Sequence, residues 1–293
     1  MIKKYKKKIV ITGGSGLLGK YFYKKYKNVY KIIKYPYRIE KFKRFEKWLS
    51  KKKFNYFIHF AAITKNESKK YKDILQLVNV KSPIKILNII NEKNINNFSY
   101  FLFISSSHVY GYSKNKIKEN KKRVPQNSYG LSKKKVEDYI MHNRKKYNFK
   151  VGIARIFNST GPKQKKGNFV PDMILKMKKI NKIKNINQYR DFIHIDDVSK
   201  SIKRLIEREI EYPINISSGQ KINLINACKI LNDKFVKKKV LFDLKKGSDI
   251  YGDNSLLKKI GIKKFKNIYQ ILSAYKKWKN IFFLEPIELV IFW

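Results

Sequence analysis

Short apolar runs alternate along the chain with longer stretches in which apolar and polar residues are mixed. The runs cover residues 9–12, 30–33, 56–60, 101–105 and 151–157. The stretches with the length and periodicity of helices are 17–26, 71–91 and 128–146. Pro83 predicts a helix start or a kink near 80–82 within the second of them. Alternation of strand and helix is typical of a parallel sheet covered by crossover helices, so the pattern predicts an α/β fold.

The later part of the chain is less regular. After Gly161-Pro162 the pattern is interrupted by further Gly and Pro residues and by a polar stretch at 181–189, before a strand-like segment at 192–195. A change of this kind indicates a second, smaller unit. We expect a main domain in residues 1–160, to which 186–205 returns, and a C-terminal lobe in 161–185 and 206–280.

The first apolar run ends in a glycine-rich turn, Thr12-Gly13-Gly14-Ser15-Gly16-Leu17-Leu18-Gly19. Gly14, Gly16 and Gly19 have the spacing of the Rossmann dinucleotide-binding fingerprint, in which a side chain would keep a pyrophosphate away from the amides of a helix N-terminus. Such short motifs recur by chance, but this one directly follows a strand. It therefore predicts a Rossmann-type, doubly wound parallel sheet with a dinucleotide site formed by Gly13, Ser15, Gly16, Leu17, Leu18 and Gly19.

Tyr129 and Lys133 lie four residues apart in the predicted helix 128–146, so both project from one face. A phenol with a pKa near 10 is a poor acid or base at neutral pH, and an adjacent ammonium stabilises the phenolate and lowers that pKa. In so Lys-rich a chain, the spacing alone more often marks a solvated helix face. The serines 105–107 change this interpretation, because they end a strand at the edge where doubly wound sheets bind ligands.

The charge of the chain is extreme, with 69 Lys and Arg against 21 Asp and Glu and a formal net charge of +48. Such a balance ordinarily indicates nucleic acid or an anionic surface as the partner. Here 61 of the basic residues are Lys and they are spread over the whole chain, whereas nucleic-acid readers favour Arg concentrated on one face. A nucleic-acid-binding protein on this fold is therefore kept only as a remote alternative.

Other features exclude whole classes of protein. The single cysteine, Cys228, excludes an internal disulfide and a multi-cysteine metal site, and the four histidines show no ligand spacing, so no metal is expected. No apolar run is long enough for a membrane span, and the basic start lacks a signal-peptide core, so we expect a cytoplasmic protein without a membrane partner. The apolar tail 281–293 is too short to cross a bilayer and is expected to pack on the body or on a subunit partner.

The glycine turn, the strand-end serines and Tyr-x-x-x-Lys occur in the order that characterises one family. In these motifs the chain resembles the extended short-chain dehydrogenase/reductases, the NAD(P)-dependent sugar-nucleotide epimerases, dehydratases and reductases. Four further segments match along most of the chain: Ile58-His59-Phe60-Ala61-Ala62, Asn79-Val80, residues 155–162 around Asn158, and residues 190–198 beginning at Arg190. Several motifs in order are far more specific than any one alone.

The resemblance implies an enzyme with a nicotinamide cofactor in the main domain and a nucleoside-diphosphate sugar held against the C-terminal lobe. It assigns Tyr129 as general acid/base, Lys133 as the group that lowers its pKa and binds the nicotinamide ribose, and Ser106 as the hydrogen-bond partner of the reacting sugar oxygen. Ser105 and Ser107 remain alternatives to Ser106. Besides the turn residues, Tyr129 and Lys133, the implied cofactor contacts are Phe60, Ala61, Ala62 and Asn79. The implied substrate contacts are Ser107, His108, Asn158 and Arg190. By family analogy we also expect a homodimer.

One departure from the family concerns the choice of cofactor. Relatives that prefer NAD carry an acidic residue at the end of the second strand, where it binds the ribose 2′-hydroxyl. No such residue stands in 32–38, which instead contains Lys34 and Arg38. Cations in this region would suit a 2′-phosphate, so NADP is favoured over NAD.

A second departure concerns the reaction. The 4,6-dehydratases of the family carry an acidic pair after the strand-end hydroxyl, and Ser107-His108 stands in those places. A dehydratase is therefore disfavoured. The leading hypothesis is a 4-keto-(6-deoxy)sugar-nucleotide reductase, and the alternative is an NAD-dependent 4-epimerase similar to UDP-glucose 4-epimerase. His108 could serve as a second acid/base or simply line the pocket.

Overall fold

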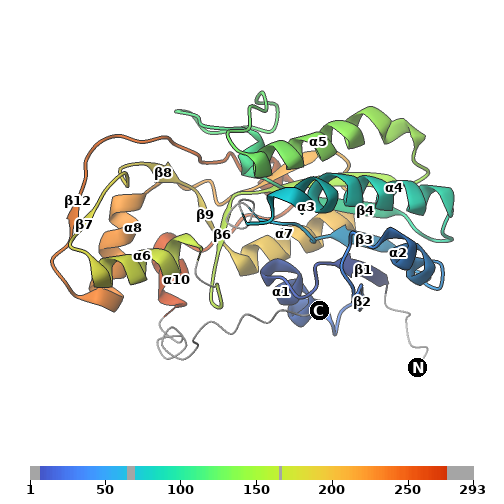
Figure 1. Cartoon of the computed structure of the whole chain (residues 1–293), viewed down its shortest axis with the longest axis horizontal. Coiled ribbons are helices and arrows are strands. Elements are labelled where there is room, and N and C mark those ends of the chain that lie inside the picture. Colours follow the sequence, from blue (N-terminus) through green and yellow to red (C-terminus); the bar gives the residue numbers. More distant parts are fainter. Residues whose placement is uncertain (1–6, 65–69, 165–166, 276–293) are drawn as a thin grey trace.

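A six-stranded parallel sheet forms the centre of the computed structural model, which describes residues 7–64, 70–164 and 167–275 (Figure 1). Its strands are β1 (Lys8–Thr12), β2 (Lys31–Lys34), β3 (Tyr56–His59), β4 (Tyr100–Ser106), β5 (Lys150–Ile156) and β10 (Pro213–Ile216). They stand in the order β10-β5-β4-β3-β1-β2, and every neighbouring pair is parallel. The predicted α/β fold with a parallel sheet is confirmed.

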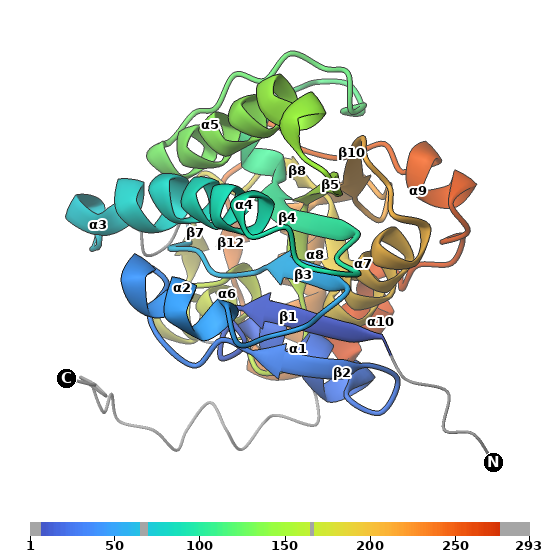
Figure 2. The ribbon, with the colours of Figure 1, turned by 90° about the vertical axis from the view of Figure 1, so that its right-hand side faces the viewer.

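Helices cover both faces of this sheet, as expected for a doubly wound fold (Figure 2). One face packs against α1 (Leu17–Tyr26) and α7 (Ile195–Arg208), and the other against α2 (Phe42–Leu49), α4 (Ser82–Glu92) and α5 (Ser128–Asn143). Successive residues of a strand point to opposite faces, so Ile9 and Ile11 join the α1/α7 core while Val10 joins the other.

The strand order places the predicted ligand site. β1 is flanked by β2 on one side and β3 on the other, so the chain first runs from β1 to the edge strand β2 and then crosses back to continue through β3, β4 and β5 in the opposite direction. In open parallel sheets, ligands bind outside the carboxyl ends of the strands at such a switch point. The glycine turn follows β1 directly, so it lies at this point of the sheet.

The predicted helix 71–91 is interrupted in the structure. It comprises α3 (Lys72–Gln76), a π-helical turn η1 (Leu77–Lys81) and α4, with Pro83 in the first turn of α4. Proline lacks an amide hydrogen, and its ring crowds the carbonyl of the residue four positions earlier. The wider turn accommodates this, since the Ser82 amide bonds to the Leu77 carbonyl, five residues back.

The later part of the chain forms a second apolar core around α6 (Phe169–Lys179), α8 (Leu224–Leu231) and α10 (Ile268–Ser273). Three strand pairs accompany it: β6 (Asn158–Thr160) with β9 (Phe192–His194), β7 (Lys182–Ile183) with β12 (Leu241–Phe242), and β8 (Tyr189–Arg190) with β11 (Ile222–Asn223). The short turns are η2 (Ser107–Val109), η3 (Arg144–Lys146) and η4 (Asn232–Val236). In Figure 1 this part lies beside the main sheet.

The assignment of chain segments to two units stays a prediction, with one correction of detail. β10 and α9 (Ser255–Lys259) lie in the stretch 206–280 that was assigned to the lobe. β10 nevertheless pairs with β5, and Leu257 of α9 belongs to the core under the main sheet. The apolar tail 281–293 lies outside the described residues. Among those that are described, no helix is long and apolar enough to cross a membrane.

Candidate active site

Two glycines allow the turn after β1 to pack closely. Gly13 has φ +64°, and a Cβ there would lie 2.6 Å from the Ala61 amide nitrogen. A Cβ on Gly19 would lie 2.4 Å from the Gly13 carbonyl oxygen. Because a Cβ at either position would clash with backbone atoms, only glycine fits there. The turn therefore packs closely between α1 and the segment that follows β3.

The N-terminus of α1 suits an anion. Its N-cap residue is Gly16, no side chain caps the helix, and no acidic residue lies in the first turn. The first amide groups of a helix have no partner within the helix, and the helix dipole favours negative charge there. These features fit the diphosphate of a dinucleotide, which the amides of Leu17 and Leu18 would bind.

The cations expected near a 2′-phosphate are only partly available. Lys34 is exposed, its side chain crosses close to Gly14, and its ammonium lies 4.4 Å from the centre of the Tyr23 ring. Arg38 is also exposed but forms an ion pair with Glu40, a residue to which the sequence assigned no role. The charge of Arg38 is thus offset by Glu40.

Asn79 lies beneath the site and is bound within the protein. Its side-chain oxygen accepts from the Ile63 amide at 2.8 Å, and its nitrogen donates to the Ile63 carbonyl and to Ser132 Oγ at 2.9 and 3.1 Å. Ser132 Oγ in turn donates to the Tyr129 carbonyl. Both amide hydrogens are therefore engaged, and Asn79 joins the segment after β3, with Phe60, Ala61 and Ala62, to the first turn of α5.

The side chains of Tyr129 and Lys133 lie on one face of α5, where Asn127 caps the helix by accepting from the Gly130 amide. Tyr129 is half-buried, whereas Lys133 is almost completely buried. The Lys133 ammonium donates to the Ile104 carbonyl at 2.8 Å and lies 6.0 Å from the centre of the Tyr129 ring. Burial lowers the pKa of Lys133 to about 7, with the negative charge of Glu137 acting in the opposite direction.

The serines at the end of β4 differ in their availability. Ser105 Oγ donates to Glu137 Oε1 at 2.5 Å and is committed to the interior. Among the residues that the structure describes, Ser106 Oγ accepts a single hydrogen bond, a long one of 3.3 Å from the His108 amide. This difference favours Ser106 over Ser105 as the hydroxyl that meets a ligand. The His108 ring packs edge-on against Tyr129 at 5.8 Å, so the strand end and the first turn of α5 meet.

Asn158 and Arg190 are also bound within the protein. Asn158 donates to the Asp191 carbonyl at 3.0 Å, across the pair of β6 and β9. The Arg190 guanidinium donates to the carbonyls of Tyr189 and Ser248 and to the Gln188 side chain, and burial lowers its pKa. A phosphate contact would require Arg190 to exchange these partners, so a substrate role for it stays a prediction.

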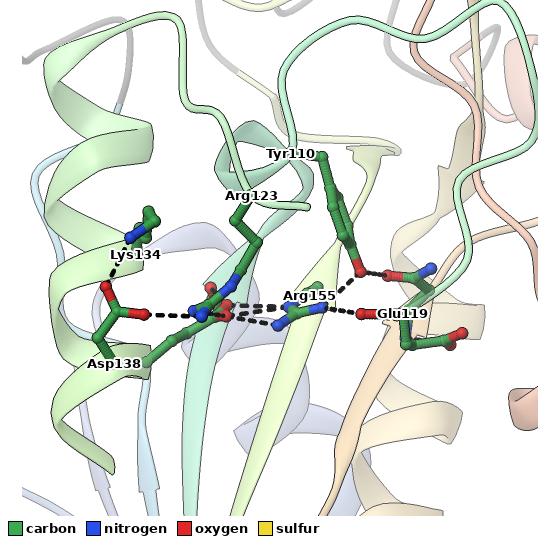
Figure 3. A network of polar contacts seen from close by, with 9 residues as sticks. Tyr110, Glu119, Arg123, Lys134, Asp138 and Arg155 are labelled. Atoms are coloured by element: carbon green, nitrogen blue, oxygen red, sulfur yellow. Dashed lines mark hydrogen bonds and ion pairs between the residues drawn. The ribbon is translucent and has the colours of Figure 1, made fainter. Parts of the chain in front are cut away.

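A buried polar network behind the site was missed by the sequence analysis (Figure 3). Glu137 on α5 and Arg155 on β5 are 0% and 1% exposed, and Arg155 Nη2 donates to Glu137 Oε2 at 2.7 Å. Arg155 Nη1 also donates to Tyr110 Oη at 2.6 Å, and Tyr110 donates to Asn215. The available signal was spacing, because Glu137 follows Lys133 by the same four residues that separate Lys133 from Tyr129.

Comparisons with known proteins agree with the fold and with the family resemblance. Residues 9–217 match the sequence profile of the NAD dependent epimerase/dehydratase family. The dTDP-4-dehydro-6-deoxyglucose reductase of Escherichia coli is 28% identical over 267 residues, which cover 80% of this chain and 83% of that protein. RMD from Pseudomonas aeruginosa complexed with NADPH has a TM-score of 0.80 at 25% identity, covering 93% and 99% of the two chains. The UDP-glucose 4-epimerase of Thermotoga maritima with UDP-glucose also has a TM-score of 0.80, over 92% and 99% of the chains, but at 20% identity it shows the fold alone.

Proposed function

This chain belongs to the NAD dependent epimerase/dehydratase family, and on that premise we propose that it is an NAD(P)-dependent oxidoreductase of nucleoside-diphosphate sugars that reduces a 4-keto group. The observation that carries the proposal is the meeting of Tyr129 and Lys133 on α5 with the hydroxyl-bearing end of β4. A reductase named as such stands among the similar proteins, covering most of the chain.

The roles proposed for these residues follow from their chemistry. A bound nicotinamide supplies or accepts the hydride. The Tyr129 hydroxyl moves a proton to or from the sugar oxygen as that oxygen changes between ketone and alcohol. The Lys133 ammonium lies beside Tyr129 and favours its ionised form, because opposite charges stabilise each other in a site of low dielectric. Ser106 holds the same sugar oxygen by a hydrogen bond.

Two parts of the main domain would hold the cofactor. The uncapped N-terminus of α1 would bind the diphosphate through backbone amides. Lys34 lies against the glycine turn, where it would meet a 2′-phosphate, so we propose NADP as the preferred cofactor. The homodimer and the cytoplasmic location belong to the same proposal.

A sugar-nucleotide 4-epimerase is the second candidate. The Arg38–Glu40 ion pair favours it, because it offsets one of the two cations expected at a 2′-phosphate and leaves NAD acceptable. An epimerase retains its cofactor through a cycle of oxidation and reduction, whereas a reductase consumes one reduced cofactor per turnover. The two proposals therefore differ in net cofactor change.

The test monitors the absorbance of reduced nicotinamide with purified protein, NADPH or NADH, and a panel of 4-keto-6-deoxy sugar nucleotides. We expect oxidation of NADPH by the wild type and a loss of at least about a hundredfold in Tyr129→Phe, the scale of general acid catalysis. Binding of NADPH should remain within a few-fold in that variant. Conversion of UDP-hexoses without net cofactor change would instead establish the epimerase, and full activity in Tyr129→Phe would contradict both.

A further inference from the structure

Three ionisable side chains lie at successive turns of α5, and the proposed mechanism uses only two of them. Tyr129, Lys133 and Glu137 are spaced by four residues, so they share a face of the helix. Glu137 is the most deeply buried of the three, with no exposed surface. Burying a carboxylate is costly unless it is paired, so its partners indicate what it does.

Glu137 links four segments of the main domain through its hydrogen bonds. Arg155 on β5 donates to it from Nε at 3.1 Å and from Nη2 at 2.7 Å. Arg123, in the segment that leads into α5, donates from Nη1 at 3.1 Å, and Ser105 on β4 donates from Oγ at 2.5 Å. One carboxylate thus joins α5 to two strands and to the segment before the helix.

Two consecutive residues of β4 are attached to two consecutive turns of α5. The Ile104 carbonyl accepts from Lys133 Nζ, and the Ser105 hydroxyl donates to Glu137. Ser106, the proposed sugar contact, is the next residue of the strand. The position of the Ser106 hydroxyl relative to Tyr129 therefore depends on both attachments, and a slip of the helix along the strand would break them together.

Glu137 also sets the charge around Lys133. The Lys133 amine lies against the Ile104 carbonyl of β4, the Phe103 ring at 4.7 Å and the Tyr129 ring at 6.0 Å. Its charge also acts on His59 of β3. Burial and the charge of Lys133 lower the pKa of His59 to about 3, so this histidine is neutral near pH 7. Glu137, one turn away, is the carboxylate whose charge favours the protonated amine.

We propose that Glu137 is a positioning residue for the proposed catalytic pair: it fixes α5 on the strand end through Ser105, and its buried carboxylate favours the charged form of the Lys133 amine one helical turn away. The inference rests on the proposed function, because that function gives Tyr129 and Lys133 their roles. It assigns Glu137 no contact with the substrate.

The effect of the Glu137 charge on Lys133 is tested by measuring the affinity for NADPH by fluorescence at a series of pH values. This measurement needs no sugar substrate. We expect wild-type affinity to fall as Lys133 loses its proton, and this step to be absent in Lys133→Met. In Glu137→Gln the step should move to lower pH by roughly one unit, the scale of a buried charge one helical turn away. Glu137→Asp keeps the charge and should restore the wild-type step.

The matched control is Asp138→Asn, which makes the same charge change at the next residue of α5. Asp138 is 42% exposed and pairs with Arg123 and Lys134, so its loss should leave the step in place. A folded Glu137→Gln protein with an unshifted step, or a wild-type step that persists in Lys133→Met, overturns the inference alone. A wild type that binds neither NADPH nor NADH overturns the proposed function itself.

A milder variant covers the case in which Glu137→Gln does not fold. Ser105→Ala removes the strand-end hydrogen bond and leaves every charge in place, so kcat for the ketone should fall roughly tenfold with KM little changed, the effect of one hydrogen bond to a charged group. Ser99→Ala is its control, since Ser99 donates to Glu209 just before the start of the same strand. Equal kcat in the two variants overturns the positioning role.

Discussion

Replacing Lys133 by methionine should stabilise the protein near neutral pH while it abolishes turnover. Lys133 is 2% exposed, and its pKa is lowered by burial from 10.5 to about 7. The difference of pKa between unfolded and folded chain corresponds to about 5 kcal/mol of unfavourable charge burial. Methionine has a similar volume and no charge, so Lys133→Met removes this cost and loses the hydrogen bond to Ile104, about 1–2 kcal/mol.

The sign of the pH dependence is set by proton binding. Between about pH 7 and 10.5 the unfolded chain holds a proton on Lys133 that the folded protein lacks, so wild-type stability rises with pH in this window. Below pH 7 Lys133 is charged in both states, so the full free-energy cost of burying the charged amine is present. Lys133→Met should therefore exceed the wild type by roughly 3 kcal/mol at pH 6, and the advantage should vanish near pH 10.

Urea unfolding monitored by circular dichroism at pH 6 and pH 10 measures both quantities. The control is Lys134→Met on the same helix, where the lysine pairs with Asp138 at 2.7 Å on the surface, so the change should stay within about 1 kcal/mol at either pH. A Lys133→Met protein that is less stable than the wild type at pH 6, by the same amount as at pH 10, would refute the reasoning. Lys133 would then not be a strained buried charge.

Three further predictions address packing and buried charge. Gly13→Ala should lower the unfolding free energy by more than about 2 kcal/mol, because the new Cβ would lie 2.6 Å from backbone atoms at a residue with φ +64°. Gly247→Ala is the control, since its Cβ would approach only side-chain atoms closer than 3.6 Å, and it should cost about 1 kcal/mol or less in the same urea titration. Arg155→Met should cost about 3–5 kcal/mol by leaving the Glu137 carboxylate buried without its main partner, and a loss below 1 kcal/mol in calorimetry would contradict this pairing. Burial raises the pKa of Asp191 from 3.8 to about 6, so between these pH values the folded protein binds the proton more tightly than the unfolded chain. The free energy of unfolding should therefore rise by about 2 kcal/mol as the pH falls from 6 to 4. Asp191→Asn, unfolded at both pH values, should lack that rise.

Elements with a strong local pattern could be predicted from the sequence. The predicted helix at 17–26 matches α1, and the five predicted strands fall on β1 to β5 with ends that differ by a residue or so. β1, β3, β4 and β5 are buried on both faces, so they read as continuous apolar runs, whereas the edge strand β2 is only partly buried. α2 was missed because Lys and Arg interrupt its short apolar face, which rests on Phe45 and Leu49. β10 was assigned to the lobe because its pairing with β5 is long-range.

The motifs of the candidate site could be predicted from the sequence, but the hydrogen-bond partners of their side chains could not. The spacing of Tyr129 and Lys133 and the strand-end serines could be read from the chain, and the structure brings them together. That Ser105 is bound to Glu137 while Ser106 is less engaged depends on a helix more than thirty residues away. Arg190 likewise carries the charge that a phosphate requires, but its partners include Ser248, from a distant loop.

Features that depend on neighbours along the chain could be read from the amino-acid sequence: the order of strands and helices, the glycines of the turn, and the face that Tyr129 shares with Lys133. Which polar groups form hydrogen bonds within the protein, and how deeply a charge is buried, became clear from the folded structure. Glu137 and Asp138 are adjacent carboxylates on one helix, yet one is enclosed with Arg155 and the other faces solvent. Hydrogen bonding and desolvation depend on contacts between distant segments, and those contacts exist only once the sheet has assembled.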